Sequence, residues 1–202
     1  MFITLEGGEG VGKSTAAAGL AALLQAEGQE VLLTREPGGT KGAEAIRALL
    51  LNQEIPLAPL AQTMLHFAAR MDHVAKLIRP ALARGAIVIC DRFYDSTMAY
   101  QAYGQGVAQA DIQTLIQLSG LKPDLTFLLE LSEDEAKNRL IARASGTDRY
   151  EAMDAAFFAR VRQGFAGIAK AEPERFAVIN ASPAPAAVVA AMRTALRERA
   201  GR

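Results

Sequence analysis

The stretch that decides the fold is GGEGVGKS, which occupies Gly7–Ser14. It fits the pattern G-x-x-x-x-G-K-[ST], and it lies between the short apolar run Phe2–Leu5 and a helical pattern that should stop near Gly28. Glycines let the backbone wrap with its amides pointing inward, and these amides form an anion site with the start of the following helix. In this pattern Lys13 reaches the β- and γ-phosphates of a nucleotide, and the Ser14 hydroxyl ligates Mg²⁺. The alternative is a glycine-rich turn with an incidental lysine.

Short apolar runs alternate with helical patterns along the rest of the chain. The runs are Phe2–Leu5, Val31–Thr34, Ala86–Cys90, Leu125–Leu131 and Phe176–Ile179. Because most of them lack polar alternation, they read as strands buried on both faces. We therefore expect an α/β fold in which one parallel sheet carries helices on both faces, built as a single domain over residues 1–202.

Helical periodicity appears between these runs. The residues that should share a helix face are Leu20, Leu23 and Leu24, then Ile112, Leu115 and Ile116, then Phe158, Val161, Phe165 and Ile168, and finally Val188, Val189, Met192 and Leu196. Pro80 should kink or interrupt the helical stretch Leu60–Arg84 because proline lacks an amide hydrogen. Ser132 and Glu135 form a capping box that should begin a helix.

The composition excludes several classes of protein. Lys and Arg number 22 and Asp and Glu number 22, so the chain has no basic excess for a long polyanion, and we expect no nucleic-acid partner. No segment reaches the ~18 uncharged apolar residues that would span a bilayer, and the apolar run at the N-terminus stops at Glu6 without a basic segment before it. The single cysteine, Cys90, cannot form an internal disulfide. We therefore expect a cytoplasmic protein without a membrane partner.

Asp91 directly follows the apolar run Ala86–Cys90, so its carboxylate should lie at the tip of a buried strand, where open α/β sheets bind ligands. There it could hold Mg²⁺, directly or through water; alternatively, it caps the next turn. A phosphate-binding loop occurs in GTPase switches, motor ATPases and small-molecule kinases. The chain has no Asn-Lys-x-Asp stretch for reading guanine, and 202 residues leave little room for a motor. A kinase of a small metabolite is the class we favour.

Five stretches together resemble the thymidylate kinases of bacteria. They are Glu6–Ser14, Thr34–Thr40 (TREPGGT), Phe67–Arg70, Asp91–Gln101 (DRFYDSTMAYQ) and Pro123–Thr126. The resemblance extends over nearly the whole chain, from about residue 2 to 200. It implies phosphorylation of dTMP to dTDP with ATP and Mg²⁺, the three-layer P-loop NTPase fold with a five-stranded parallel sheet, a small lid at about 139–151, and a homodimer.

The resemblance also implies where each substrate binds. On the ATP side it assigns Gly7, Gly8, Glu9, Gly10, Val11, Gly12, Lys13, Ser14, Thr15 and Arg139. On the dTMP side it assigns Glu36, Arg47, His66, Phe67, Arg70, Arg92, Ser96, Thr97, Tyr100 and Gln101.

Individual roles follow from the resemblance. Arg92 and Arg47 would grip the dTMP phosphate, since a guanidinium fork matches phosphate oxygens, and Arg70 would donate to a thymine carbonyl. Thr97 and Gln101 would help to read the base edge. For Arg47 the alternative is a solvated helix face.

Three further residues would complete the dTMP side. Tyr100 would pack beside the sugar where a 2′-hydroxyl would project, or alternatively only against a helix. Glu9 would bind the 3′-hydroxyl and help to order Mg²⁺, and Glu36 would support the same polar cluster. No general base is needed, because the acceptor is an anionic phosphate oxygen.

Three arginines fall in the expected lid. Arg139 and Arg143 are four residues apart and share a helix face, and Arg149 follows the sequence Gly-Thr-Asp. Relatives with glycine where this chain has Gly10 carry the catalytic arginine in the lid. Arg143 and Arg149 are therefore the candidates that would join Lys13, Glu9 and Arg92 in catalysis, while Arg139 would stack near adenine. The alternative is a solvated basic helix end.

The sequence departs from the family at the base-stacking position. Four residues before Arg70, where the family has phenylalanine, this chain has His66, and Phe67 follows. Either ring could stack on thymine, or both could be ordinary helix residues. For His73 a structural role is the favoured interpretation. Two other functions remain open: a P-loop kinase of another nucleoside or nucleotide, and an ATP-binding regulatory module.

Overall fold

A computed structural model describes residues 1–143 and 153–200 of the chain. Within these residues, five parallel strands form one sheet in the order β2-β3-β1-β4-β5. The strands are β1 (Phe2–Glu6), β2 (Val31–Arg35), β3 (Ile87–Asp91), β4 (Leu125–Glu130) and β5 (Phe176–Asn180). All five predicted runs are strands, and four of them end one residue later than predicted. Glu6 and Asp91 therefore belong to the strand ends themselves.

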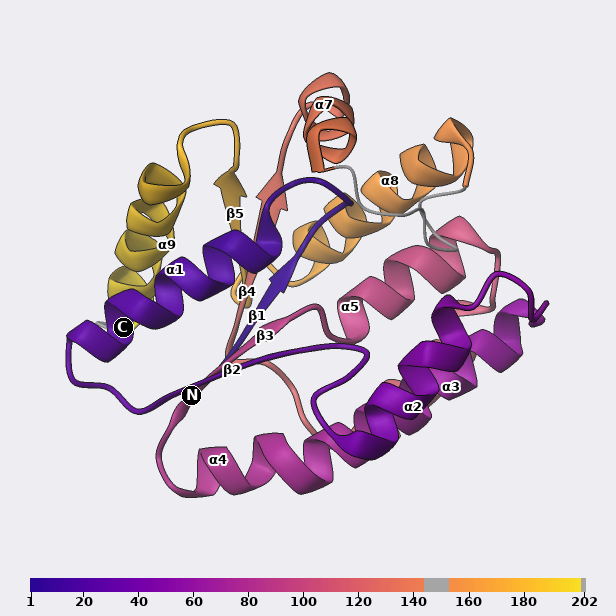
Figure 1. Ribbon diagram of the computed structural model, residues 1–202, viewed down its shortest axis with the longest axis horizontal. Helices are drawn as coiled ribbons and strands as arrows, with labels where there is room; N and C mark the ends of the chain where they lie inside the picture. The colour runs from indigo at the N-terminus through magenta and orange to yellow at the C-terminus, as the bar shows by residue number, and fades with distance from the viewer. Residues whose placement is uncertain (144–152, 201–202) are drawn as a thin grey trace.

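Helices cover both faces of the sheet, as predicted (Figure 1). They are α1 (Lys13–Ala26), α2 (Lys41–Leu51), α3 (Pro59–His73), α4 (Arg79–Ala83), α5 (Tyr94–Thr97), α6 (Gln109–Ser119), α7 (Glu133–Arg143), α8 (Ala155–Ala171) and α9 (Pro185–Ala200), with two π-helices, η1 (Val74–Ile78) and η2 (Met98–Gly104). Helices α1 and α9 pack together on one face, and α3 to α6 and α8 lie on the other. The three-layer α/β prediction is confirmed.

The core consists of side chains from both faces of the strands. Ile3 and Leu5 of β1 pack with Leu20 and Leu24 of α1, while Phe2 of the same strand packs on the opposite side. This two-sided burial explains why β1, β3 and β4 read as unbroken apolar runs in the sequence. For β2 and β5 the expected burial on both faces is wrong, because they lie at the edges of the sheet, where Leu33 is 43% and Val178 is 55% exposed.

Two predicted helical features take a more specific form. The stretch around Pro80 stays helical, but π-helix η1 ends at Ile78, directly before the α-helical turn that holds Pro80, and the Arg79 amide donates to Val74 O. The interruption is thus a wide turn. In α8, Val161 and Phe165 are buried and Phe158 and Ile168 pack, partly buried, against the same cluster, as predicted, while Phe157 is the more deeply buried ring at the start.

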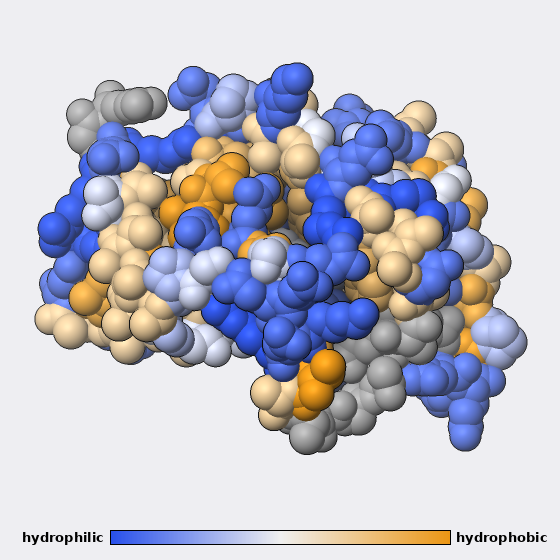
Figure 2. Space-filling model, turned by 90° about the horizontal axis from the view of Figure 1, so that it is seen from above, coloured by the Kyte–Doolittle hydropathy of each residue, from blue (hydrophilic) through white to orange (hydrophobic). Residues whose placement is uncertain are grey.

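The parallel strands bring their carboxyl ends to one edge of the sheet. In Figure 1 the arrows of β4 and β5 point to the upper edge, where α7 lies. Figure 2 views the molecule from that side, and hydrophilic side chains gather in the middle of the face. Loops that leave the strands at this edge can therefore bring polar groups together.

A buried ion pair links α5 to the segment just before β5. Arg175, just before β5, donates to both carboxylate oxygens of Asp95 in α5, at 2.6 and 2.9 Å, and to Thr126 Oγ1 at 2.7 Å. Arg175 and Asp95 are 5% and 2% exposed. Glu172 accepts two further hydrogen bonds from the same guanidinium. Arg175 therefore anchors α5 to the region around β5.

We expect Arg175→Leu to lower the free energy of unfolding by about 3–5 kcal/mol, because it leaves the Asp95 carboxylate buried without its cation. Combining it with Asp95→Asn should cost less than Arg175→Leu alone. Urea unfolding measures all of these values. Arg162→Leu, which breaks the exposed pair between Arg162 of α8 and Glu133 of α7, is the control and should have little effect. A double variant as unstable as the sum of the two single changes would contradict the pairing.

Candidate active site

A cleft of about 820 Å³ opens at the carboxyl edge of the sheet. It is lined from the loop after β1, the ends of β2 and β3, helices α2, α3, α5 and α7, η2 and the loop after β5. The sequence-predicted residues that line it are Glu9, Gly10, Val11, Gly12, Lys13, Ser14, Thr15, Glu36, Arg47, His66, Arg70, Asp91, Arg92, Ser96, Thr97, Tyr100, Gln101 and Arg139. Residues far apart in the sequence are thus brought to one place.

Five predicted residues are not among the described residues that line the cleft. The carbonyls of Gly7 and Gly8 contact the Lys13 ammonium rather than the cleft surface. Phe67 is 2% exposed and packs in the core under Arg70, whose guanidinium lies 4.5 Å from the ring centroid. Arg149 lies outside the described residues, and the backbone of Arg143 ends α7 while its side chain falls outside the description.

The Lys13 ammonium is enclosed at the start of α1. Its Nζ donates to Gly8 O at 2.6 Å and to Gly7 O at 3.1 Å. Burial, together with the positive charge of Arg92, lowers the pKa of Lys13 to about 8, although Glu9, Asp91 and Glu6 oppose the shift. A phosphate beside Lys13 would favour its charged form.

Ser14 and Asp91 meet at the edge of the cleft. Ser14 Oγ donates to Asp91 Oδ2 at 2.5 Å, while Asp91 Oδ1 is buried and has no hydrogen-bond partner among the described residues. A hydroxyl beside a carboxylate with one unused oxygen suits a hard cation such as Mg²⁺, which takes few protein ligands and fills its shell with phosphate and water. In the described part of the chain, no group of three or more His, Cys, Asp or Glu side chains is arranged to enclose a metal.

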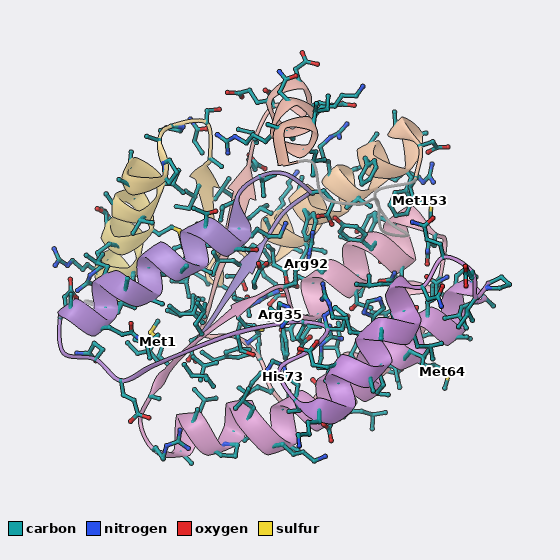
Figure 3. The ribbon with its side chains drawn as sticks, viewed as in Figure 1. Met1, Arg35, Met64, His73, Arg92 and Met153 are labelled. Atoms are coloured by element: carbon teal, nitrogen blue, oxygen red, sulfur yellow. The ribbon has the colours of Figure 1, made fainter. Side chains whose placement is uncertain are left out.

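Arg92 is held from several sides at the end of β3. Its Nη2 donates to Glu9 Oε1 at 2.5 Å, and its Nη1 donates to Ser96 Oγ at 3.0 Å and to Gly7 O at 3.1 Å. Tyr100 Oη donates to the same Glu9 oxygen at 2.9 Å. Burial acts to lower the pKa of Arg92, but Glu9 leads the negative groups that raise it above its usual range. The guanidinium therefore stays charged inside the cleft. Figure 3 labels Arg92 in the middle of the molecule.

The backbone of Arg92 is also unusual. Its φ of 69° lies in the left-handed region, which costs a non-glycine residue about 1–3 kcal/mol. The surrounding bonds hold this turn, because the Arg92 amide donates to Leu5 O and the Phe93 amide donates to Glu6 Oε1 at 2.7 Å. The turn directs the guanidinium back toward the phosphate-binding loop.

On the other side of the cleft, Arg70 reaches from α3 to the end of β2. Its Nε donates to Glu36 Oε2 at 2.7 Å and its Nη2 to Thr97 Oγ1 at 3.1 Å. His66, one turn earlier on α3, lines the cleft, and burial together with Arg70, Arg92 and Arg47 lowers its pKa to about 3. The imidazole is therefore neutral near pH 7.

Sequence reasoning missed two parts of the site. Glu6, fully buried, accepts hydrogen bonds from the Phe93 amide and from Ser96 Oγ, and so supports the turn that carries Arg92. The loop Ala181–Pro185 after β5 lines the cleft beside Arg139, whose Nη2 donates to Ala181 O at 2.9 Å. The available signal was position, since both follow or end a buried strand at its carboxyl tip.

Comparisons with known proteins show what the chain is similar to. The model of the family described as thymidylate kinase matches residues 5–192. The chain is 52% identical to the thymidylate kinase of Gluconobacter oxydans, covering 98% of this chain and 94% of that protein, and 51% identical to that of Chromohalobacter salexigens, covering 98% and 95%. A crystal structure of thymidylate kinase from Ehrlichia chaffeensis superposes with a TM-score of 0.79 at 38% identity, covering 97% of this chain and 98% of that chain. Among the helices of residues 1–143 and 153–200, none has the length and apolar character needed to cross a membrane.

Glu6 gives the site a pH-dependent effect on stability. Burial and the neighbouring Asp95 raise the pKa of Glu6 to about 8, so between pH 4.5 and 8 the folded protein holds a proton that the unfolded chain releases. The stability contributed by this proton is complete below about pH 4.5 and is lost as pH rises through 8.

We therefore expect the free energy of unfolding of the wild type to fall between pH 5 and 8, and the contribution of Glu6 to this fall is up to about 1.4 kcal/mol per pH unit. Glu6→Gln should remove that contribution and so flatten the curve. Urea unfolding at several pH values measures the slope. Glu130→Gln, at the exposed end of β4, is the matched control and should keep the wild-type slope. Parallel curves for wild type and Glu6→Gln would show that Glu6 does not take up this proton.

Proposed function

The chain belongs to the thymidylate kinase family, and we propose from that membership how its cleft carries out the family's reaction. It is a nucleoside monophosphate kinase that phosphorylates dTMP to dTDP with ATP, in nucleotide synthesis. The observation that carries the proposal is that Lys13 lines the same cleft as Arg47, Arg70 and Arg92. The cleft thus offers one anion site for the phosphates of ATP, the phosphoryl donor, and a second for the phosphate of dTMP, the acceptor.

ATP would bind along the phosphate-binding loop. The amides of Gly8–Thr15 and the Lys13 ammonium would hold its phosphates, and Arg139, together with the loop Ala181–Pro185, would lie beside its base. Ser14 and Asp91 would hold Mg²⁺, which neutralises charge on the phosphates during transfer. Lys13 then needs only to exchange its carbonyl partners for phosphate oxygens.

The acceptor dTMP would bind on the α3 and η2 side. Arg92 and Arg47 would hold its phosphate, while Glu9 would bind the 3′-hydroxyl and Tyr100 would pack beside the deoxyribose. Because the acceptor oxygen is already anionic, the residues act by position and charge rather than as a general base.

The thymine base would lie against the inner part of this wall. We assign the stacking role to His66 rather than Phe67, because the neutral His66 ring lines the cleft and Phe67 is covered by Arg70. Arg70 would donate to a thymine carbonyl, and Glu36, Ser96, Thr97 and Gln101 would orient the groups that meet the nucleotide.

Residues about 139–151 would form a lid of this single-domain protein, with Arg143 and Arg149 as the arginines that meet the transferring phosphoryl group. Position 10 supports this assignment. Gly10 has a φ of 75°, and a Cβ there would lie 2.5 Å from Ala136 O of α7, so the loop itself has no room for an arginine. We also propose that the protein is a cytoplasmic homodimer.

An acceptor scan tests the function. With ATP and Mg²⁺ we expect dTMP to give a higher kcat/KM than dUMP, dCMP or dGMP, and thymidine, which lacks the phosphate that Arg92 and Arg47 hold, to give no turnover. Coupled detection of ADP measures the rates. Preference for a different acceptor would indicate a kinase of another nucleotide, and ATP turnover independent of any acceptor would indicate a regulatory module.

Removing the lid arginines should slow phosphoryl transfer without unfolding the protein. We expect Arg143→Ala or Arg149→Ala to lower kcat by about 100-fold or more, the scale at which an electrophilic arginine acts. The exposed Arg162→Ala on α8 is the control and should keep the wild-type kcat. Unchanged turnover in both single variants and in the double variant would remove the lid from the chemistry.

A further inference from the structure

His73 is fully buried at the end of α3 and does not line the cleft. Both of its ring nitrogens have partners from the segment around the end of β2. Nδ1 lies 3.0 Å from Glu36 Oε1, and Nε2 lies 2.8 Å from Thr34 Oγ1. Because a carboxylate only accepts hydrogen bonds, Nδ1 carries the proton that it donates to Glu36.

Glu36 connects this histidine to the cleft. It is 4% exposed, and its second oxygen, Oε2, accepts from Arg70 Nε at 2.7 Å. One carboxylate therefore spans His73 and Arg70, and each of these residues holds one of its two oxygens.

Arg70 is fixed by three kinds of contact. Glu36 holds Nε, Thr97 holds Nη2, and the guanidinium lies over the rings of Phe67 and Phe93 at 4.5 and 5.1 Å. The third nitrogen, Nη1, is buried and has no hydrogen-bond partner among the described residues. A buried donor left over in a cleft wall is costly unless a ligand accepts from it.

The segment after β2 leaves space for the imidazole. A Cβ at Gly39 would overlap His73 Nε2 and Cδ2, and the φ of Gly39 is +88°. Thr34, Glu36 and Gly39 therefore all meet the same ring (Figure 3 labels His73 beside this segment). The segment TREPGGT thus contacts His73 and also contributes residues to the cleft.

We propose that His73 is a positioning residue for base selection: it orients Glu36, and through Glu36 it sets the Arg70 guanidinium so that Nη1 donates to the C4 carbonyl of thymine. This inference rests on the proposed function. Cytosine carries an amino group at C4, which would place a donor against a donor and leave Arg70 Nη1 unpaired. A pyrimidine with a carbonyl at C4 is therefore accepted, and one with an amino group is rejected.

Two amide substitutions separate the two ring nitrogens. In His73→Asn the amide nitrogen lies near the position of Nδ1 and can still donate to Glu36. In His73→Gln the amide reaches the position of Nε2, so it can serve Thr34 but not Glu36. Both variants remove the ring and leave amides of similar polarity, so a merely structural role would make them similar.

The readout is the ratio of the Ki of dCMP, measured as a competitor of dTMP, to the KM of dTMP. We expect His73→Gln to raise the KM of dTMP and to lower this ratio, each by about tenfold, the scale of one hydrogen bond to a charged group. His73→Asn should stay within about threefold of wild type in both. The KM of ATP should change less than about twofold in both variants.

Equal effects of the two variants, or a weaker dTMP affinity with an unchanged ratio, would overturn the proposal. If His73→Gln does not fold, Thr34→Val provides a second test, because it removes the far anchor of the ring; it should lower the ratio in the same direction, and an unchanged ratio contradicts the proposal. Wild-type turnover of dTMP is measured in the same assay. Its absence would refute the proposed function, whereas its presence with an unaltered ratio would refute only the role of His73.

Discussion

The structure depends on the pairing of buried guanidinium groups with carboxylates. Arg92 pairs with Glu9, Arg70 with Glu36 and Arg175 with Asp95, and the members of the latter two pairs are at most 5% exposed. Unpaired, each charge of those two pairs would cost several kcal/mol to keep out of water, whereas Arg92 and Glu9 are only partly buried. Two of the three carboxylates lie at or just after the end of a strand or in the loop that follows it. The parallel sheet is what brings those ends together, so the fold and the charge pairing require each other.

Most of the fold could be predicted because its strands and the glycine-rich loop correspond to short patterns of neighbouring residues. The five apolar runs became the five strands, and the glycine-rich loop fell between β1 and α1, since an apolar run bounded by turn residues is recognised without information from distant residues. The phosphate-binding loop and Asp91, which the motifs placed at strand tips, line the cleft as well, whereas Arg47, Arg70 and the other lining residues on helices were expected there only from the family resemblance. The differences have local causes: Pro80 is accommodated by a wide helical turn rather than a break, and β2 and β5 are partly exposed because they lie at the edges of the sheet.

What the sequence did not reveal are contacts between distant residues. Arg175 meets Asp95 across 80 positions, and Glu6 meets Ser96 across 90. No spacing in the sequence predicts such pairs, because they depend on the order of the strands in the sheet and on which face of the sheet each helix covers. His73 is the clearest example. As a single histidine on a helix it carries no signal, and its link to the cleft exists only because α3 brings it against the segment that follows β2.

The network also bears on how an anion binds in the cleft. Lys13 already donates to two carbonyls, and Arg92 to Glu9, Ser96 and Gly7. An incoming phosphate therefore competes with partners inside the protein, and its net gain is the difference between two sets of hydrogen bonds rather than the full attraction between opposite charges. A phosphate that meets only one of these cations gains little. One that brings several into contact at once gains more, and the transferring phosphoryl group, placed between donor and acceptor, is the group able to do so.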